Sequence, residues 1–211
     1  MDPHAGQPVV EAGLPLGQAP VVVLMVHGRN AAPASILDLA PRLARPRVTY
    51  LAPAAAGRTW YPHSFLADLS SNEPGLSSGL GVLAALVQRV EAAGIPRARI
   101  VLLGFSQGAC LAAEFAVRHA SRFGGVVVFS GGVVGPPGTA WTAPGSFAGT
   151  PMFFGCSDHD SHVPEWRVTE SADLCTRMGA AVTRRIYPGM GHVVNDDEIA
   201  WTQRLLDAVA G

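Results

Sequence analysis

The sequence contains no lysine, so all fifteen of its basic residues are arginine. Sixteen acidic residues balance them, and the formal net charge at pH 7 is −1. Such a chain lacks the broad positive field expected of a nucleic-acid-binding protein, and no local run of arginines supplies one. We therefore expect no nucleic-acid partner.

Long apolar runs and a cysteine framework are also missing. The longest apolar run near the start, residues 21–26, is far too short to cross a bilayer. Residues 1–18 hold no Lys or Arg, which a secretory signal needs ahead of its apolar stretch. The three cysteines, Cys110, Cys156 and Cys175, form no CxxC pair and are typical of reduced thiols. These features predict a cytoplasmic protein without stable membrane insertion.

The chain is long and apolar enough to form one domain. Its 211 residues are 48% hydrophobic, and a chain of this length buries a sufficient core without disulfides or a metal. Residues 1–19 are rich in Pro, Gly and Ala and show little periodicity. We interpret them as an N-terminal arm, either mobile or a short edge element, and residues 20–211 as a single domain.

Short β-branched runs alternate along this domain with segments of helical spacing. Runs that are nearly continuously apolar are typical of strands buried on both faces of a parallel sheet. The expected strands are residues 21–27, 47–52, 99–105, 125–129, 151–155 and 182–187. The expected helices are residues 34–44, 76–93, 107–119, 165–178 and 196–209, and residues 131–150 are expected to form an irregular loop. This order predicts an α/β fold with a mostly parallel sheet and helices on both faces.

One local pattern points to a nucleophile. The expected strand 99–105 runs into Gly104-Phe105-Ser106-Gln107-Gly108, a G-x-S-x-G sequence directly before an expected helix. A sharp turn between strand and helix exposes the serine hydroxyl, and the flanking glycines let the two elements pass closely. The alternative interpretation is a glycine-rich turn that holds a small buried serine.

A serine hydroxyl needs a base, and His192 is the best candidate. It follows the expected strand 182–187 and the glycine-rich stretch Pro188-Gly189-Met190-Gly191, which can bend it toward Ser106. In this kind of fold the partners follow in the order Ser, Asp, His. The alternative is a solvent-exposed loop histidine.

The acid that orients the base is ambiguous from spacing alone. Asp158 and Asp160 are two residues apart, and both follow the expected strand 151–155. Together with His159 and His162 they could also form a metal site, although no complementary ligand cluster is present elsewhere.

Two backbone amides are candidates for an oxyanion hole. The first expected strand ends in His27-Gly28-Arg29-Asn30, and the glycine lets this loop approach a substrate. The Arg29 amide and the Gln107 amide, which follows the nucleophile, are the expected donors. The Arg29 side chain is then free to meet a substrate carboxylate or to face solvent.

An aromatic segment follows the second expected strand. Trp60, Tyr61, Phe65 and Leu66 lie where ligands bind in open α/β sheets, and we expect them to form an apolar wall of the substrate pocket. The alternative for these side chains is local core packing.

In this order, the motifs resemble those of the phospholipase/carboxylesterase family of α/β-hydrolases, which includes acyl-protein thioesterases and small bacterial carboxylesterases. The resemblance runs from about Val21 to the C-terminus. It is carried by His27-Gly28-Arg29, Gly104-Phe105-Ser106-Gln107-Gly108-Ala109, Asp160-Ser161-His162-Val163-Pro164 and Gly189-Met190-Gly191-His192.

The resemblance implies a role for each candidate residue. In that family the acid lies three residues before a Val-Pro or Ile-Pro pair, which selects Asp160, with Asp158 nearby. It implies Ser106 as nucleophile and His192 as base, with the Arg29 and Gln107 amides as oxyanion donors. We also assign Val163 to the substrate pocket. Ser161 stands where many members have proline, and Trp60-Tyr61-Pro62 resembles only a bacterial subgroup.

The absence of a long insertion between the expected strands argues against a large lid, and the resemblance implies a single-domain α/β-hydrolase fold. It implies a serine hydrolase that cleaves small to medium acyl esters, or thioesters, through an acyl-enzyme without a metal or organic cofactor. The expected partner is a small-molecule ester, and the oligomeric state is left open, with a homodimer as one option. One rival is a non-catalytic small-molecule receptor with this fold. Another is an acyltransferase or perhydrolase that uses the same triad.

Overall fold

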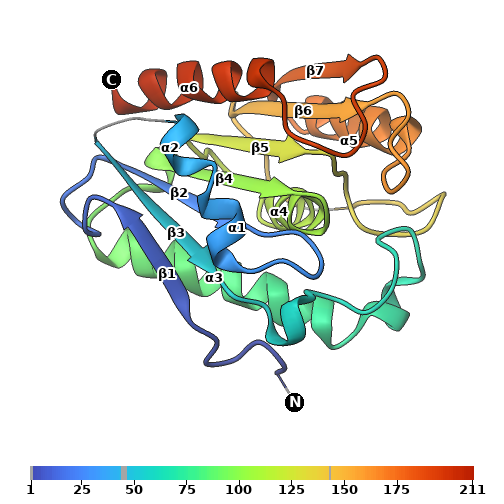
Figure 1. Cartoon of the computed structure of the whole chain (residues 1–211), viewed down its shortest axis with the longest axis horizontal. Helices are drawn as coiled ribbons and strands as arrows, with labels where there is room; N and C mark the ends of the chain where they lie inside the picture. Colours follow the sequence, from blue (N-terminus) through green and yellow to red (C-terminus); the bar gives the residue numbers. More distant parts are fainter. Residues whose placement is uncertain (1, 44–46, 143) are drawn as a thin grey trace.

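Seven strands form one central sheet in the order β1-β3-β2-β4-β5-β6-β7 (Figure 1). The computed structural model describes residues 2–43, 47–142 and 144–211. Within them, β1 pairs with β3 antiparallel at one edge, and the other neighbouring strands pair in parallel. The strands are β1 (Val9–Gly13), β2 (Val21–Val26), β3 (Val48–Pro53), β4 (Ile100–Phe105), β5 (Gly125–Phe129), β6 (Pro151–Ser157) and β7 (Ala181–Tyr187).

Helices cover both faces of the sheet, as the alternating sequence pattern predicts (Figure 1). Along β2, alternate side chains pack into two separate apolar clusters. One cluster joins the sheet to α3 (Gly75–Ala92), α4 (Gln107–Arg118) and α5 (Glu165–Arg177). The other joins it to α1 (Pro33–Leu37), α2 (Ala40–Leu43) and α6 (Asp196–Ala210). The predicted α/β architecture is therefore confirmed.

The prediction of one helix over residues 34–44 is wrong. The segment forms two short helices, α1 and α2, separated by a turn at residues 38–39. Pro41 accounts for the break, because it has no N–H to donate to the carbonyl of Leu37 and its ring crowds that carbonyl. The expected helix end at Ala44 lies outside the described residues.

The N-terminal segment lies against the domain rather than apart from it. Residues 9–13 form β1, the edge strand, and His4 ahead of it is buried. The Nε2 atom of His4 donates to the Trp60 carbonyl at 2.9 Å, and its Nδ1 accepts from the Ala56 amide at 3.1 Å. Met1 lies outside the described residues.

The carboxyl ends of the parallel strands meet at one edge of the sheet, where open α/β sheets bind ligands. The segments that follow β2, β4, β6 and β7 carry Arg29, Ser106, Asp160 and His192 respectively. The loop over residues 131–150 contains no helix or strand in its described part, as predicted; its Ala143 lies outside the described residues.

Candidate active site

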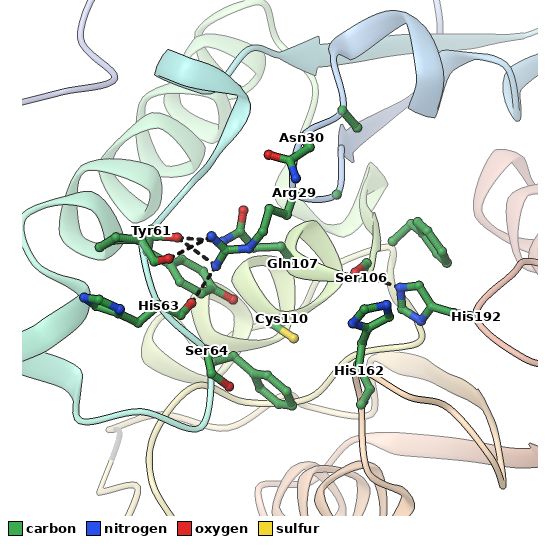
Figure 2. A pocket seen from close by; sticks show the side chains of 16 residues that line it. Arg29, Asn30, Tyr61, His63, Ser64, Ser106, Gln107, Cys110, His162 and His192 are labelled. Carbon is green, nitrogen blue, oxygen red and sulfur yellow. Dashed lines mark hydrogen bonds between the residues drawn. The ribbon is translucent and has the colours of Figure 1, made fainter.

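Ser106 stands at the sharp turn between β4 and α4. Its backbone angles are φ 55° and ψ −123°, a positive-φ conformation that few residues other than glycine adopt. Two main-chain hydrogen bonds of 3.0 Å hold the turn: the Ser106 amide donates to the Phe129 carbonyl, and the Ser106 carbonyl accepts from the Cys110 amide. The strained turn is thus fixed by its surroundings, and Ser106 lines a pocket at the sheet edge (Figure 2).

The two motif glycines allow a close approach of backbones. A Cβ at Gly104 would lie 2.4 Å from the carbonyl oxygen of Gly108, and one at Gly108 would lie 2.1 Å from that of Val26. Both distances are far below van der Waals contact, so no side chain fits. The helix α4 therefore begins directly against the backbone of β2, as the sequence motif requires.

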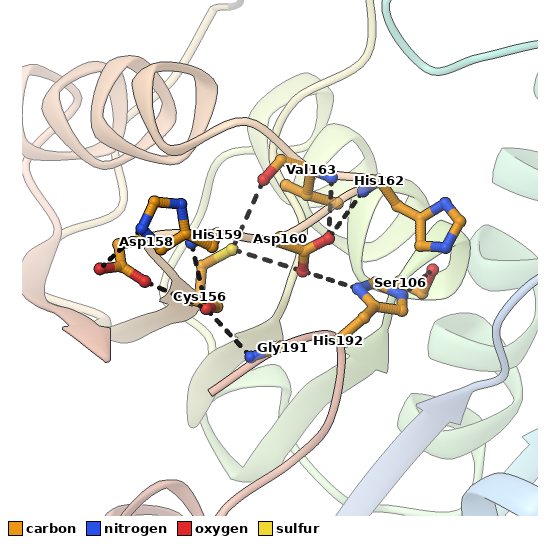
Figure 3. A network of polar contacts seen from close by, with 10 residues as sticks. Ser106, Cys156, Asp158, His159, Asp160, His162, Val163, Gly191 and His192 are labelled. Atoms are coloured by element: carbon orange, nitrogen blue, oxygen red, sulfur yellow. Dashed lines mark hydrogen bonds and ion pairs between the residues drawn. The ribbon is translucent and has the colours of Figure 1, made fainter. Parts of the chain in front are cut away.

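His192 lies between Ser106 and Asp160 (Figure 3). Its Nε2 atom is 2.9 Å from the Ser106 hydroxyl oxygen, and its Nδ1 is 2.6 Å from Oδ2 of Asp160. The three side chains come from three different loops, and 86 residues separate the serine from the histidine. The aromatic ring of Phe105 packs against the imidazole with centroids 4.8 Å apart.

The hydrogen bonds of Asp160 set the state of the imidazole. Burial alone would raise the pKa of this carboxyl group, but hydrogen bonds from His192 and from the His162 and Val163 amides outweigh it and lower the pKa. The two amides donate to Oδ1 at 2.8 and 3.0 Å. An ionised carboxylate can only accept, so Nδ1 of His192 carries the proton and Nε2 accepts from the Ser106 hydroxyl.

Asp158 makes a different set of contacts. Its Oδ1 accepts from the Gly189 amide at 2.8 Å, and the adjacent Ser157 hydroxyl accepts from the Gly191 amide at 3.1 Å. Both hydrogen bonds fix the position of the glycine-rich stretch that leads to His192. The sequence does not reveal this role for Ser157, because its partner is a backbone amide 34 residues away.

The segment around Asp160 does not assemble a metal site. Among the described residues, no group of three or more His, Cys, Asp or Glu side chains is arranged to hold a metal ion. The Asp160 carboxylate is instead used by His192 and by backbone amides.

Arg29 and Gln107 both line the pocket next to Ser106. Within the described part of the chain, neither of their backbone amides donates a hydrogen bond to the protein. The Gln107 amide also belongs to the first turn of α4, where N–H groups have no intrahelical acceptor and the helix dipole favours negative charge.

The side chains of the same two residues hold the loop after β3. The side-chain amide of Gln107 accepts a hydrogen bond from the backbone N–H of Trp60 at 3.0 Å and donates one to the Tyr61 carbonyl at 2.8 Å. The Arg29 guanidinium donates to the carbonyls of Tyr61, Pro62 and His63 at 2.5–3.0 Å (Figure 2). The Arg29 side chain therefore holds the loop after β3, a role that differs from both expected alternatives, contact with a substrate carboxylate and exposure to solvent.

The pocket beside Ser106 has a volume of about 540 Å³. Of the side chains expected to form it, Tyr61, Phe65 and Val163 are part of its lining. Cys110 also lines it, and its position one helical turn after Ser106 was the available signal. Burial raises the pKa of the Cys110 thiol to about 12, so this group stays protonated.

Trp60 and Leu66 do not line the pocket, which corrects the expectation for both. Trp60 is fully buried behind it, where its indole N–H donates to the His27 carbonyl at 2.9 Å. Leu66 is partly buried and packs against the apolar cluster under α3 and α4. An aromatic loop segment indicates burial of its rings but does not say which ring faces a ligand.

The family model for Phospholipase/Carboxylesterase matches residues 9–209. The chain belongs to this family. Acyl-protein thioesterase 1 of Eremothecium gossypii is 31% identical over 169 residues, which are 74% of this chain and 68% of that protein. The chain is accordingly an enzyme, a hydrolase of the esterase and thioesterase kind.

Solved structures agree with this assignment. A phospholipase/carboxylesterase from Dyadobacter fermentans is 36% identical and superposes with a TM-score of 0.92, covering 100% of this chain and 99% of that one. A carboxylesterase from Bacillus cereus, 20% identical, has a TM-score of 0.76 over 97% and 95% of the two chains and shares the fold. The predicted single-domain α/β-hydrolase fold of this phospholipase/carboxylesterase member is thus confirmed.

Within the described residues, no helix of this phospholipase/carboxylesterase member combines the length and apolar character that a membrane span needs.

Proposed function

We propose that the protein is a serine hydrolase that cleaves carboxylic esters, including thioesters, through an acyl-enzyme. The observation that carries this proposal is the position of the His192 imidazole, bonded on one side to the Ser106 hydroxyl and on the other to Asp160. Nucleophile, base and orienting acid in this arrangement are the requirements for activating a serine.

In the first half of the reaction, the Ser106 oxygen attacks the ester carbonyl while Nε2 of His192 takes the hydroxyl proton. Asp160 keeps the proton on Nδ1 and stabilises the imidazolium that forms. The negative charge on the former carbonyl oxygen is met by the Arg29 and Gln107 amides. The tetrahedral intermediate collapses, the bond to the alcohol or thiol breaks, and His192 returns its proton to that leaving group.

In the second half, His192 removes a proton from water as the water oxygen attacks the acyl-Ser106 carbonyl. The second intermediate releases the carboxylic acid, and the proton on Nε2 returns to the Ser106 oxygen. A pocket of about 540 Å³ is large enough for a small or medium acyl chain. The resemblance to a protein named acyl-protein thioesterase 1 supports thioesters beside oxygen esters.

The Ser106→Ala variant tests the nucleophile. We expect turnover of p-nitrophenyl butyrate to fall by about a thousandfold or more, because the acyl-enzyme can no longer form. The wild type should release an initial burst of p-nitrophenol in proportion to enzyme, and the variant should release none. The melting temperature measured by circular dichroism should change little, because the residue packs no core.

Ser77→Ala, on the exposed surface of α3, is the matched control and should keep wild-type activity. Retained activity in Ser106→Ala would remove this serine from the mechanism. A wild type that releases no chromophore from any ester or thioester of a chain-length series would indicate a ligand-binding protein. Added alcohol or peroxide that diverts the acyl group to a new product would indicate acyl transfer or perhydrolysis.

A further inference from the structure

Among the residues that the structure describes, those that line the substrate pocket include basic side chains but no acidic ones. Its described lining contains Arg29 and the three histidines His63, His162 and His192, but none of these lining residues is Asp or Glu. The Asp160 carboxylate behind His192 has a side chain that is 0% exposed, and it accepts hydrogen bonds from His192 and from two backbone amides. A substrate in this pocket therefore meets nitrogen donors on several sides and no accessible carboxylate.

The charge of Arg29 is not neutralised by another residue. Its three side-chain hydrogen bonds go to neutral carbonyls, and its guanidinium lies 6.0 Å from the centre of the Tyr61 ring. Among the described residues no carboxylate forms an ion pair with it. An arginine keeps its charge at any working pH, so the carbonyls hold a permanent positive charge at the pocket wall.

His162 adds hydrogen-bond donors next to the reacting atoms. Its ring packs edge to face against the His192 imidazole with centroids 4.8 Å apart, and Figure 2 draws it beside Ser106. Its backbone is anchored by the hydrogen bond from its amide to the Asp160 carboxylate, whereas its ring is exposed at the pocket and neither ring nitrogen has a protein partner in the described structure. The histidines His4, His27 and His192 differ from it, because all of their ring nitrogens are used.

We propose that the substrates of this enzyme are esters or thioesters that carry a carboxylate near the scissile bond. In this assignment His162 donates a hydrogen bond to that carboxylate, and Arg29 supplies the favourable field. The proposal rests on the proposed function, because it names the substrate class of the same site. Hydrogen bonds to a charged group are strong enough to favour such a substrate by about tenfold or more.

Paired substrates measure this preference without changing the leaving-group chemistry much. On the alcohol side, para-acetoxybenzoate is compared with its neutral amide, para-acetoxybenzamide. On the acyl side, the p-nitrophenyl monoester of adipic acid is compared with p-nitrophenyl hexanoate. We expect kcat/KM to favour the anionic member of at least one pair by about tenfold. The pair that shows the preference identifies the side of the ester, acyl or alcohol, on which the carboxylate binds.

The His162→Phe variant tests the assigned residue. It keeps a ring beside His192 but removes both nitrogens, so we expect the anionic-to-neutral ratio to fall by about tenfold. His159→Phe is the matched control: the same change on the same loop, at a side chain that is 84% exposed, should leave the ratio unchanged. Added salt should also lower the wild-type ratio, since the Debye length shrinks from about 10 Å at 0.1 M to 3 Å at 1 M.

The outcomes separate the two proposals. A wild type that hydrolyses the neutral esters through Ser106 but shows no preference for either anionic ester would overturn the substrate class and leave the serine hydrolase intact. A preference that His162→Phe leaves unchanged would overturn the role of His162. Failure of all four esters in the wild type would count against the proposed function itself.

Discussion

Two carboxylates on the loop after β6 lie two residues apart, and only that of Asp160 contacts His192. Spacing alone could not distinguish them. The distance from Val163-Pro164 could, because the Asp160 carboxylate folds back onto the amides of His162 and Val163. The Val163 amide is thus one of the two donors that hold this carboxylate, which gives the three-residue spacing a structural role.

Replacing each aspartate by asparagine tests this difference. We expect Asp160→Asn to lower kcat by about 10⁴, because the amide can no longer hold the proton on Nδ1 of His192. Asp158→Asn should cost much less, since an amide oxygen still accepts from Gly189. Steady-state kinetics with p-nitrophenyl butyrate measures both, and the reverse order of damage would contradict the assignment of the acid.

A third carboxyl group is buried in the first turn of α6. Glu198 is 0% exposed; its Oε2 accepts from the Asn195 amide at 2.9 Å, and its Oε1 has no hydrogen-bond partner in the described structure. Burial raises the pKa of Glu198 from the ordinary 4.5 to about 7. Because the folded protein then binds this proton more tightly than the unfolded chain, stability falls as the pH rises from 4.5 to 7.

Glu198→Gln removes this titration. We expect the free energy of unfolding of the variant minus that of the wild type to be larger at pH 8 than at pH 4.5, by roughly 3 kcal/mol at most, because only the wild type loses stability as Glu198 ionises. Urea unfolding at both pH values measures the difference. An equal effect of the substitution at the two values would contradict a raised pKa in the folded state.

At the scale of elements, short segments explain both a success and a failure of sequence analysis. The start of α6 was predictable because Asn195 is a favoured N-cap residue and three acidic residues follow it in the first turn; the structure shows that Asn195 and Glu198 also form a capping box. The split between α1 and α2 was not predicted, because the apolar spacing continues across Pro41, which interrupts the helical backbone hydrogen bonds. Helical periodicity records which side chains face the core, but not whether every backbone hydrogen bond can form.

The contribution of the α6 cap to stability can be measured with two variants of Asn195. We expect Asn195→Ala to lower the free energy of unfolding by about 1 kcal/mol, since the Glu198 amide loses its acceptor. Asn195→Asp keeps an acceptor oxygen and should retain most of the stability. Chemical denaturation of the three proteins provides the comparison, and equal losses in both variants would argue against the capping interaction.

At the scale of the whole molecule, the sequence predicted those features of the fold that follow directly from a local pattern. Alternating buried runs determine the sheet and its layers, and ordered motifs determine which loops reach the same edge. The pocket was less predictable because its wall depends on how a loop folds in three dimensions. Trp60 and Tyr61 are neighbours in sequence, yet one lies behind the wall and the other forms part of it.

Acid stability of the whole molecule should depend on His27, which joins the end of β2 to the segment after β3. Its Nδ1 donates to the Gly28 carbonyl, and its Nε2 accepts from the Ala55 amide. Burial is the main cause that lowers its pKa below 6.5 in the folded state. The unfolded chain therefore takes up a proton first as the pH falls, and the free energy of unfolding decreases below pH 6.5.

We expect His27→Gln, which keeps an acceptor for Ala55, to show a weaker decrease in stability between pH 7 and 5 than the wild type. Melting temperatures measured across that range test this expectation. Parallel curves for the two proteins would mean that His27 does not contribute to the acid response.

The placement of Trp60 also gives the molecule an intrinsic optical reporter. Its indole contacts the imidazoles of His4 and His27, with ring centroids 5.3 and 5.1 Å away, and its backbone N–H donates a hydrogen bond to the side chain of Gln107. Any displacement of this wall by an occupant changes the surroundings of the indole. Because the sequence holds four tryptophans, the reporter signal is the part of a ligand-induced change in emission that Trp60→Phe removes, and it can be measured even with compounds that are not turned over.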